Sequence, residues 1–116
     1  MRILVIDDEQ VMLGVLRRVL GSKHEVFTAE SPGEAFQMLA KISFDVILCD
    51  VHLRGVHGAA LESKLSCLDA SRMIFMTGGA LDAEDADFIS THRMLMKPFT
   101  QGQLAEAIDS LARDAA

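Results

Sequence analysis

Residues 3–8 read Ile-Leu-Val-Ile-Asp-Asp, four apolar residues followed directly by two carboxylates. A short run without polar residues is typical of a strand buried on both faces, as in a parallel sheet. Residues 46–49, 73–76 and 94–96 are also apolar, and a polar residue follows each run. Because ligands of parallel sheets bind beyond the carboxyl ends of the strands, this pattern predicts that the polar residues share one site.

The polar residues after these runs are Asp7, Asp8, Asp50, Thr77 and Lys97. Three close carboxylates repel one another, and a divalent cation such as Mg²⁺, which prefers oxygen ligands, relieves the repulsion. Asp50 follows the expected central strand and can attack phosphorus as a nucleophile. Lys97 can balance charge on the phosphoryl oxygens, and Thr77 can donate a hydrogen bond to one of them. The residues therefore favour magnesium-dependent phosphoryl chemistry.

Strand and helix signals alternate five times along the chain, with expected strands at residues 3–6, 25–29, 46–49, 73–76 and 94–96. Such alternation implies right-handed crossovers and a parallel sheet. We therefore expect an α/β fold, a flavodoxin-like doubly wound (βα)5 sheet with strand order 2-1-3-4-5, as a single domain over residues 1–116. In this order the first and third strands are neighbours, which would bring Asp7 and Asp8 next to Asp50.

The helices are expected from the spacing of apolar residues and from capping signals. The first carries a stripe that should face the sheet, formed by Met12, Val15, Leu16 and Val19. Serine or threonine followed three residues later by glutamate or glutamine predicts helix starts at Ser31 and Thr100. Weaker apolar patterns place a third helix around residues 61–68 and a fourth near residues 82–90.

Composition narrows the class of protein. The chain has 116 residues, is 50% hydrophobic and carries a net charge of −6, which argues against disorder and against direct binding of nucleic acid. No apolar run approaches the length of a membrane span, so no membrane association is expected. Cys49 and Cys67 cannot form a disulfide framework, and a reducing, cytoplasmic location is expected.

Four segments, in this order, resemble the receiver domains of response regulators in two-component signalling. They are Ile-Asp-Asp-Glu at 6–9, Asp-Val-His-Leu at 50–53, Met-Thr-Gly-Gly at 76–79 and Lys-Pro-Phe at 97–99. Each segment is weak alone, but four at the expected strand ends are specific, and the resemblance covers essentially the whole chain. The segment at 76–80 is similar to receivers attached to hybrid sensor histidine kinases.

The resemblance implies a role for each site residue. Asp50 would be the phosphoacceptor, Asp8 and Asp50 would bind Mg²⁺ directly, and Asp7 would act mainly through water. The backbone carbonyl of His52 would complete the protein ligands. Thr77 would follow the phosphoryl group, Lys97 would pair with it, and the Lys97-Pro98 peptide would be cis.

The resemblance also implies function and partners. The chain would take a phosphoryl group from a histidine kinase or a histidine phosphotransfer protein, and it would catalyse only its own phosphorylation and dephosphorylation. The fourth helix, fifth strand and fifth helix would form the responsive surface, which could also support a dimer. A covalent output or kinase domain could lie outside this chain.

Three departures from the family pattern stand out. Leu53-Arg54 replaces the usual methionine-proline, which predicts a less rigid loop. Met94 replaces an aromatic residue, which puts a rotating aromatic switch in doubt. Thr91-His92-Arg93 stands where glycine-alanine is usual before the last strand.

Two alternatives remain open. A haloacid-dehalogenase-like phosphatase also uses an aspartate nucleophile and Mg²⁺, but its nucleophile follows the first strand in an Asp-x-Asp pattern, where this chain has Asp7-Asp8-Glu9. A receiver-like interaction domain that is not phosphorylated would not need the complete set of acid, hydroxyl and lysine. A flavin- or nucleotide-binding module is excluded, because the same acidic residues would repel phosphate after the first strand.

Overall fold

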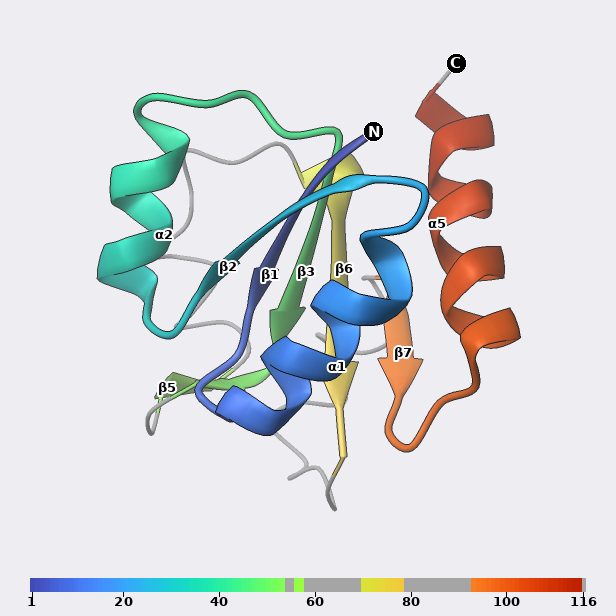
Figure 1. Cartoon of the computed structure of the whole chain (residues 1–116), viewed down its shortest axis with the longest axis horizontal. Coiled ribbons are helices and arrows are strands. Elements are labelled where there is room, and N and C mark those ends of the chain that lie inside the picture. The colour runs from blue at the N-terminus through green and yellow to red at the C-terminus, as the bar shows by residue number, and fades with distance from the viewer. Residues whose placement is uncertain (54–55, 58–69, 79–92, 116) are drawn as a thin grey trace.

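The computed structural model describes residues 1–53, 56–57, 70–78 and 93–115. Five parallel strands form one sheet in the order β2-β1-β3-β6-β7 (Figure 1). They are β1 (Arg2–Ile6), β2 (Glu25–Ala29), β3 (Val46–Asp50), β6 (Met73–Thr77) and β7 (Met94–Met96). Numbered along the chain, this sheet has the order 2-1-3-4-5, so the predicted flavodoxin-like α/β fold is confirmed.

Three α-helices are described: α1 (Gln10–Leu20), α2 (Pro32–Leu39) and α5 (Gln101–Ala115). A 3-10 helix, η1 (Ala70–Arg72), precedes β6, and two short antiparallel strands, β4 (His52–Leu53) and β5 (Val56–His57), follow β3. The helices expected around residues 61–68 and 82–90 lie outside the described residues. Among the helices in the described ranges, none combines the length and the apolar character needed to cross a bilayer.

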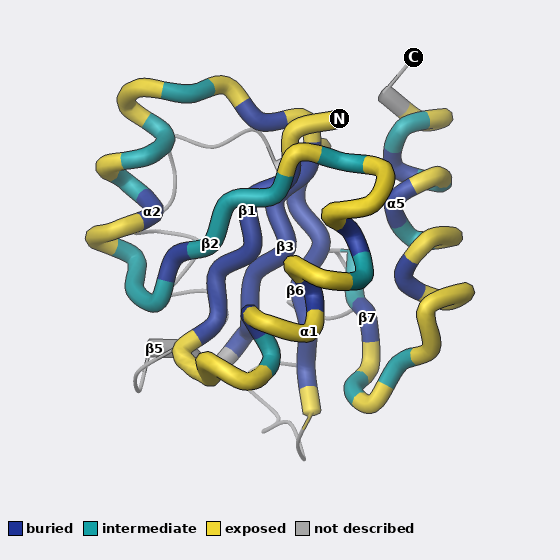
Figure 2. Tube along the Cα trace, in the orientation of Figure 1, coloured by how far each residue is buried: buried dark blue, intermediate teal, exposed yellow. Residues whose placement is uncertain are grey.

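The sheet separates two hydrophobic cores, because alternate residues of a strand face opposite sides. The core under α1 and α5 joins Ile3, Val5, Leu48 and Ile74 to Leu16, Leu104, Ile108 and Leu111. The core on the α2 side joins Leu4, Ile6, Ile47, Cys49 and Phe75 to Ala35. Figure 2 shows the buried strands between partly exposed helices. Burial on both faces explains why the strands carry uninterrupted apolar runs.

Helix α1 turns to the sheet a face that overlaps the predicted one but leaves out Val15. Leu13, Leu16 and Leu20 are buried, whereas 42% of Val15 is exposed. The prediction was therefore wrong for Val15, although the other three residues of the predicted stripe are buried or partly buried. The three leucines form an equally regular helical stripe, and they remove more apolar surface from water than valine does.

Capping contacts fix where α5 and α2 begin. The Gln103 N–H donates to Thr100 Oγ1 at 3.0 Å, and the Thr100 N–H donates to Gln103 Oε1 at 2.9 Å. At α2, the Glu34 N–H donates to Ser31 Oγ at 3.2 Å, but the Glu34 carboxylate accepts from the Glu30 N–H instead of the Ser31 N–H. Both predicted helix starts are confirmed. The cap at Thr100 fixes where the connection from β7 enters α5.

Candidate functional site

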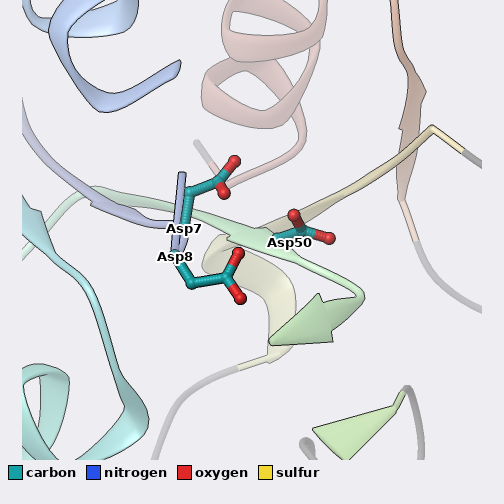
Figure 3. Close-up of side chains that lie close together, drawn as sticks. All are labelled: Asp7, Asp8 and Asp50. Atoms are coloured by element: carbon teal, nitrogen blue, oxygen red, sulfur yellow. The ribbon is translucent and has the colours of Figure 1, made fainter. Parts of the chain in front are cut away.

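Three carboxylates meet at the carboxyl edge of the sheet. Asp7 and Asp8 follow β1, and Asp50 is the last residue of β3. These strands are hydrogen-bonded neighbours in register, so the residues at their ends come together. One carboxylate oxygen from each of the three aspartates lies within 4.8 Å of the others (Figure 3). Asp7 and Asp50 are buried and Asp8 is exposed, so the cluster opens to solvent on the Asp8 side.

Lys97 binds two of these carboxylates at once. Its Nζ donates to Asp7 Oδ2 at 2.9 Å and to Asp50 Oδ2 at 3.1 Å. Only 13% of the Lys97 side chain is exposed, so these ion pairs are shielded from solvent. Lys97 follows β7, and its side chain therefore reaches across the end of β6 to atoms that follow β1 and end β3.

The pKa values of Asp7 and Lys97 shift upward for different reasons. Burial raises the pKa of Asp7, which has no exposed surface, although the Glu9 N–H and the Lys97 ammonium both lower it. Burial alone would lower the pKa of Lys97, but its bonds to Asp7 and the charge of Asp50 outweigh that effect and raise it. The lysine is therefore held firmly in its charged form, whereas the charge on Asp7 is only partly compensated.

Thr77 adds a buried hydroxyl at the end of β6, the strand that lies next to β3 in the sheet. Thr77 ends β6 and is fully buried, and its Oγ1 has no hydrogen-bond partner in the part of the chain that the structure describes. Its carbonyl accepts the Lys97 N–H at 2.7 Å, which joins the ends of β6 and β7. A buried hydroxyl without a partner costs free energy, so this group is suited to an acceptor that comes from outside the chain.

The remaining predicted residues lie close by along the chain. His52 begins β4, two residues after Asp50, so its backbone carbonyl lies just beyond the end of β3 in the chain. The Val51 N–H donates to the Met76 carbonyl at 2.9 Å, which holds the end of β3 against β6. The Lys97-Pro98 peptide is cis, as the resemblance implied.

The donor set of this site fits a hard divalent cation. Three carboxylates face one ammonium, so two formal negative charges remain when all four groups are ionised. Oxygen ligands of this kind suit Mg²⁺ or Ca²⁺, and no histidine nitrogen or sulfur belongs to the cluster among the described residues.

Sequence reasoning missed one feature of the site, the double ion pair of Lys97. It assigned this lysine to the phosphoryl group alone, whereas the structure places its ammonium between Asp7 and Asp50. The available signal was the strand order, which sets Lys97 on the far side of β6 from both carboxylates and so requires a side chain that spans the edge.

The sequence pattern of the response regulator receiver domain family matches residues 3–109. This match covers most of the chain, and the protein therefore belongs to the response regulator receiver domain family. It is a receiver of two-component signalling, a signalling module rather than a conventional enzyme.

Individual relatives agree with this assignment. A response regulatory protein of Yersinia pestis is 28% identical over 119 residues, which cover 98% of this chain and 49% of the relative. The sensory/regulatory protein RpfC of Xanthomonas campestris is 25% identical over 120 residues, 97% of this chain and 16% of RpfC. A response regulator receiver domain protein from Clostridium thermocellum superposes with a TM-score of 0.82 at 26% identity, covering 98% of this chain and 95% of that one. The chain thus spans half or less of the length of these two curated relatives.

Proposed function

We propose that Asp50 accepts a phosphoryl group from a phosphohistidine donor and that the added group changes the surface formed by β7, α5 and the helix expected near residues 82–90. The observation that carries this proposal is the position of Asp50, a buried carboxylate that shares the Lys97 ammonium with Asp7, at the sheet edge where the neighbouring strand β6 ends in Thr77. A nucleophile, a cation and an unused donor at one sheet edge are the groups that phosphoryl transfer needs.

The transfer itself needs little from the protein beyond placement. A carboxylate oxygen of Asp50 forms a bond to phosphorus as the phosphorus–nitrogen bond of the donor breaks, and the imidazole nitrogen keeps the electron pair. Because β3 is buried along its whole length, Asp50 is fixed at the end of a rigid strand. Such fixed geometry lowers the entropic part of the barrier.

We further propose that Mg²⁺ is held by Asp8, Asp50 and the backbone carbonyl of His52, with Asp7 acting through water. The Asp7 oxygens already accept hydrogen bonds, Oδ1 from the Glu9 N–H at 2.9 Å and Oδ2 from Lys97. That arrangement supports an indirect role for Asp7. When bound, the cation would neutralise charge on the phosphoryl oxygens and on the carboxylates.

Lys97 and Thr77 serve the phosphoryl group after it has arrived. Lys97 already contacts Asp50, so its ammonium is in place to pair with an oxygen bonded to phosphorus. The Thr77 hydroxyl would donate to a second oxygen and so gain the hydrogen bond that it lacks in the described part of the chain. A gain made only in the phosphorylated state favours that state, which is the basis of a switch.

The proposed partners follow from the same role. The donor would be a histidine kinase or a histidine phosphotransfer protein in the cytoplasm, and the buried free thiol of Cys49 fits a reducing compartment. Because the curated relatives are longer, an output or kinase domain is proposed to lie outside these 116 residues. A dimer through β7 and α5 is proposed as one response, because 61% of Met96 is exposed there.

Phosphorylation by acetyl phosphate tests this function. With Mg²⁺ the wild type should gain one phosphoryl group by intact mass, and a chelator should prevent the gain. Asp50→Asn should gain none, whereas the control Asp109→Asn, an exposed residue of α5, should behave as the wild type does. Full modification of Asp50→Asn would overturn the proposal, and an unmodified wild type would favour an interaction domain that is not phosphorylated.

The same experiment distinguishes the receiver from the phosphatase alternative. A haloacid-dehalogenase-like enzyme would carry its phosphoaspartate after the first strand, at Asp7. Asp7 has no exposed surface, and both its oxygens accept hydrogen bonds, so it is a poor nucleophile here. Peptide mapping of the trapped phosphoaspartate should find the modification at Asp50, and modification at Asp7 would instead support the phosphatase.

A further inference from the structure

We propose that Gln10 and Glu30 are positioning residues for the metal site. Their side chains form a hydrogen bond that fixes the start of α1, and the turn that carries Asp8 leads directly into that start. This inference rests on the proposed function, in which Asp8 binds Mg²⁺ directly.

The turn at Asp8 is held differently on its two sides. On the amino side, the Asp7 N–H donates to the Ala29 carbonyl at 3.1 Å, which joins the end of β1 to the end of β2. The Glu9 N–H donates to Asp7 Oδ1 at 2.9 Å. On the carboxyl side the turn runs into α1, so the position of Asp8 depends on how firmly the first turn of that helix is held.

The first turn of α1 lacks the usual side-chain cap. Its N-cap residue is Glu9, whose side chain makes no capping hydrogen bond in the part of the chain that the structure describes. The Leu13 N–H donates to the Glu9 carbonyl at 3.1 Å and so closes the turn. A helix start without a side-chain cap is less stable and frays more readily, so a contact from outside the helix gains importance here.

Gln10 provides such a contact. Its Nε2 donates to Glu30 Oε1 at 2.9 Å, which joins the first residue of α1 to the residue that follows β2. The Glu30 N–H in turn donates to Glu34 Oε2 at 2.6 Å, near the start of α2. The acceptor for Gln10 therefore belongs to a residue whose own backbone is held in place.

Repulsion among the aspartates explains why this hydrogen bond matters for a metal ion. One oxygen from each of Asp7, Asp8 and Asp50 lies within 4.8 Å of the others (Figure 3). Asp8 is the exposed member of the cluster, so repulsion displaces it toward solvent more readily than it displaces the two buried aspartates. A turn that is already fixed does not have to be ordered when the cation binds, and such preorganisation raises affinity.

Magnesium affinity, measured by titration of backbone amide NMR shifts, gives the first test. Gln10→Ala should raise the dissociation constant by roughly 2- to 10-fold, the usual effect of one lost hydrogen bond. The matched control is Arg17→Ala, which removes another bond between α1 and β2, from Arg17 Nη2 to Thr28 Oγ1 at 2.6 Å, about two turns further along the helix. This control should bind Mg²⁺ as the wild type does. An unchanged constant in Gln10→Ala, or an equal rise in Arg17→Ala, would overturn the inference.

Substitutions of Glu30 separate the hydrogen bond from the negative charge. Glu30→Gln keeps an acceptor oxygen without the charge, whereas Glu30→Ala keeps neither. Gln10→Ala should therefore raise the dissociation constant in the wild type and in Glu30→Gln, and leave it unchanged in Glu30→Ala. A rise of the same size in Glu30→Ala would show that Gln10 does not act through Glu30, which contradicts the inference.

Amide hydrogen exchange without metal tests the turn itself. The Leu13 N–H should exchange faster in Gln10→Ala than in the wild type, because its bond to Glu9 opens more often, and Arg17→Ala should leave this rate unchanged. Unaltered Leu13 exchange in Gln10→Ala would refute the positioning role. If the wild type bound no Mg²⁺, the metal site of the proposed function would fail, whereas this exchange rate would still decide whether Gln10 fixes the turn.

Discussion

The Nζ of Lys97 lies 2.9 Å from Oδ2 of Asp7, a carboxylate with no exposed surface. The Asp7 pKa is nevertheless raised, because burial, together with the negative charge of Asp50, outweighs the lowering by the Glu9 N–H and the lysine. Without metal, the ionised form of Asp7 is therefore less favourable in the folded chain than in the unfolded chain.

This relationship predicts a pH-dependent gain in stability for Asp7→Asn. A raised folded pKa means that the native state binds the proton more tightly, so wild-type stability falls as pH rises above the ordinary aspartate value of 3.8 and through the folded pKa. Asparagine has no such loss. In metal-free buffer Asp7→Asn should be more stable than the wild type at pH 7, and the advantage should shrink at pH 3. Urea unfolding by circular dichroism measures this, with Asp109→Asn as the exposed control; an advantage that grows toward acid would refute the assigned sign.

Cys49 should resist thiol reagents in the folded chain. Its side chain is fully buried, and burial, followed by the charges of Asp50 and Asp7, raises the pKa of the thiol well above its ordinary value. The reactive thiolate is therefore scarce and inaccessible. In Cys67→Ser, which leaves Cys49 as the single cysteine, iodoacetamide should label the unfolded chain in urea and leave the native chain unlabelled. Rapid native labelling would show that this strand opens.

The start of α5 should depend on the Thr100 hydroxyl. Thr100→Ala removes the acceptor for the Gln103 N–H and should cost about 1 kcal/mol of unfolding free energy. Thr100→Ser keeps the hydroxyl and should lose clearly less. Equal losses in the two variants, measured by urea unfolding, would show that the threonine methyl group matters more than the cap.

The face that α1 turns to the sheet can be tested with two neighbouring residues. Leu16 is 1% exposed and Val15 is 42% exposed. Leu16→Ala should cost about 3 kcal/mol, as a large-to-small change in a core does. Val15→Ala should stay within about 0.5 kcal/mol of the wild type, as surface substitutions do. Similar losses of unfolding free energy in both variants would show that Val15 also packs against the sheet, as the sequence predicted.

Features with a local cause could be predicted from the sequence. An apolar run that ends at a polar residue marks a buried strand and its carboxyl end, so the sheet and its polar edge followed from residues 3–8 and their counterparts. The cap at Thr100 needs only Gln103, three residues later. These signals do not depend on the rest of the fold.

Features set by packing could not be predicted in the same way. Two stripes on α1 have helical spacing, and only the sheet selects the one that contains Leu13 and Leu20. The strands β4 and β5 have two residues each, too few for a periodic signal. The two ion pairs of Lys97 depend on distances across the ends of four strands, from β7 to β1, which sequence order alone does not supply.

A lysine ammonium has three N–H bonds, and within the described ranges Lys97 directs hydrogen bonds to two acceptors. Among the described residues, the Lys97 ammonium therefore keeps one N–H that could donate to a further oxygen. In the proposed function, an arriving phosphoryl oxygen would therefore accept the third N–H, and neither carboxylate would have to release the lysine first. The contact between Lys97, which follows the edge strand β7, and Asp50 on the central strand β3 would then persist through phosphorylation. In that case β7 would remain coupled to Asp50 both before and after the charge at Asp50 changes.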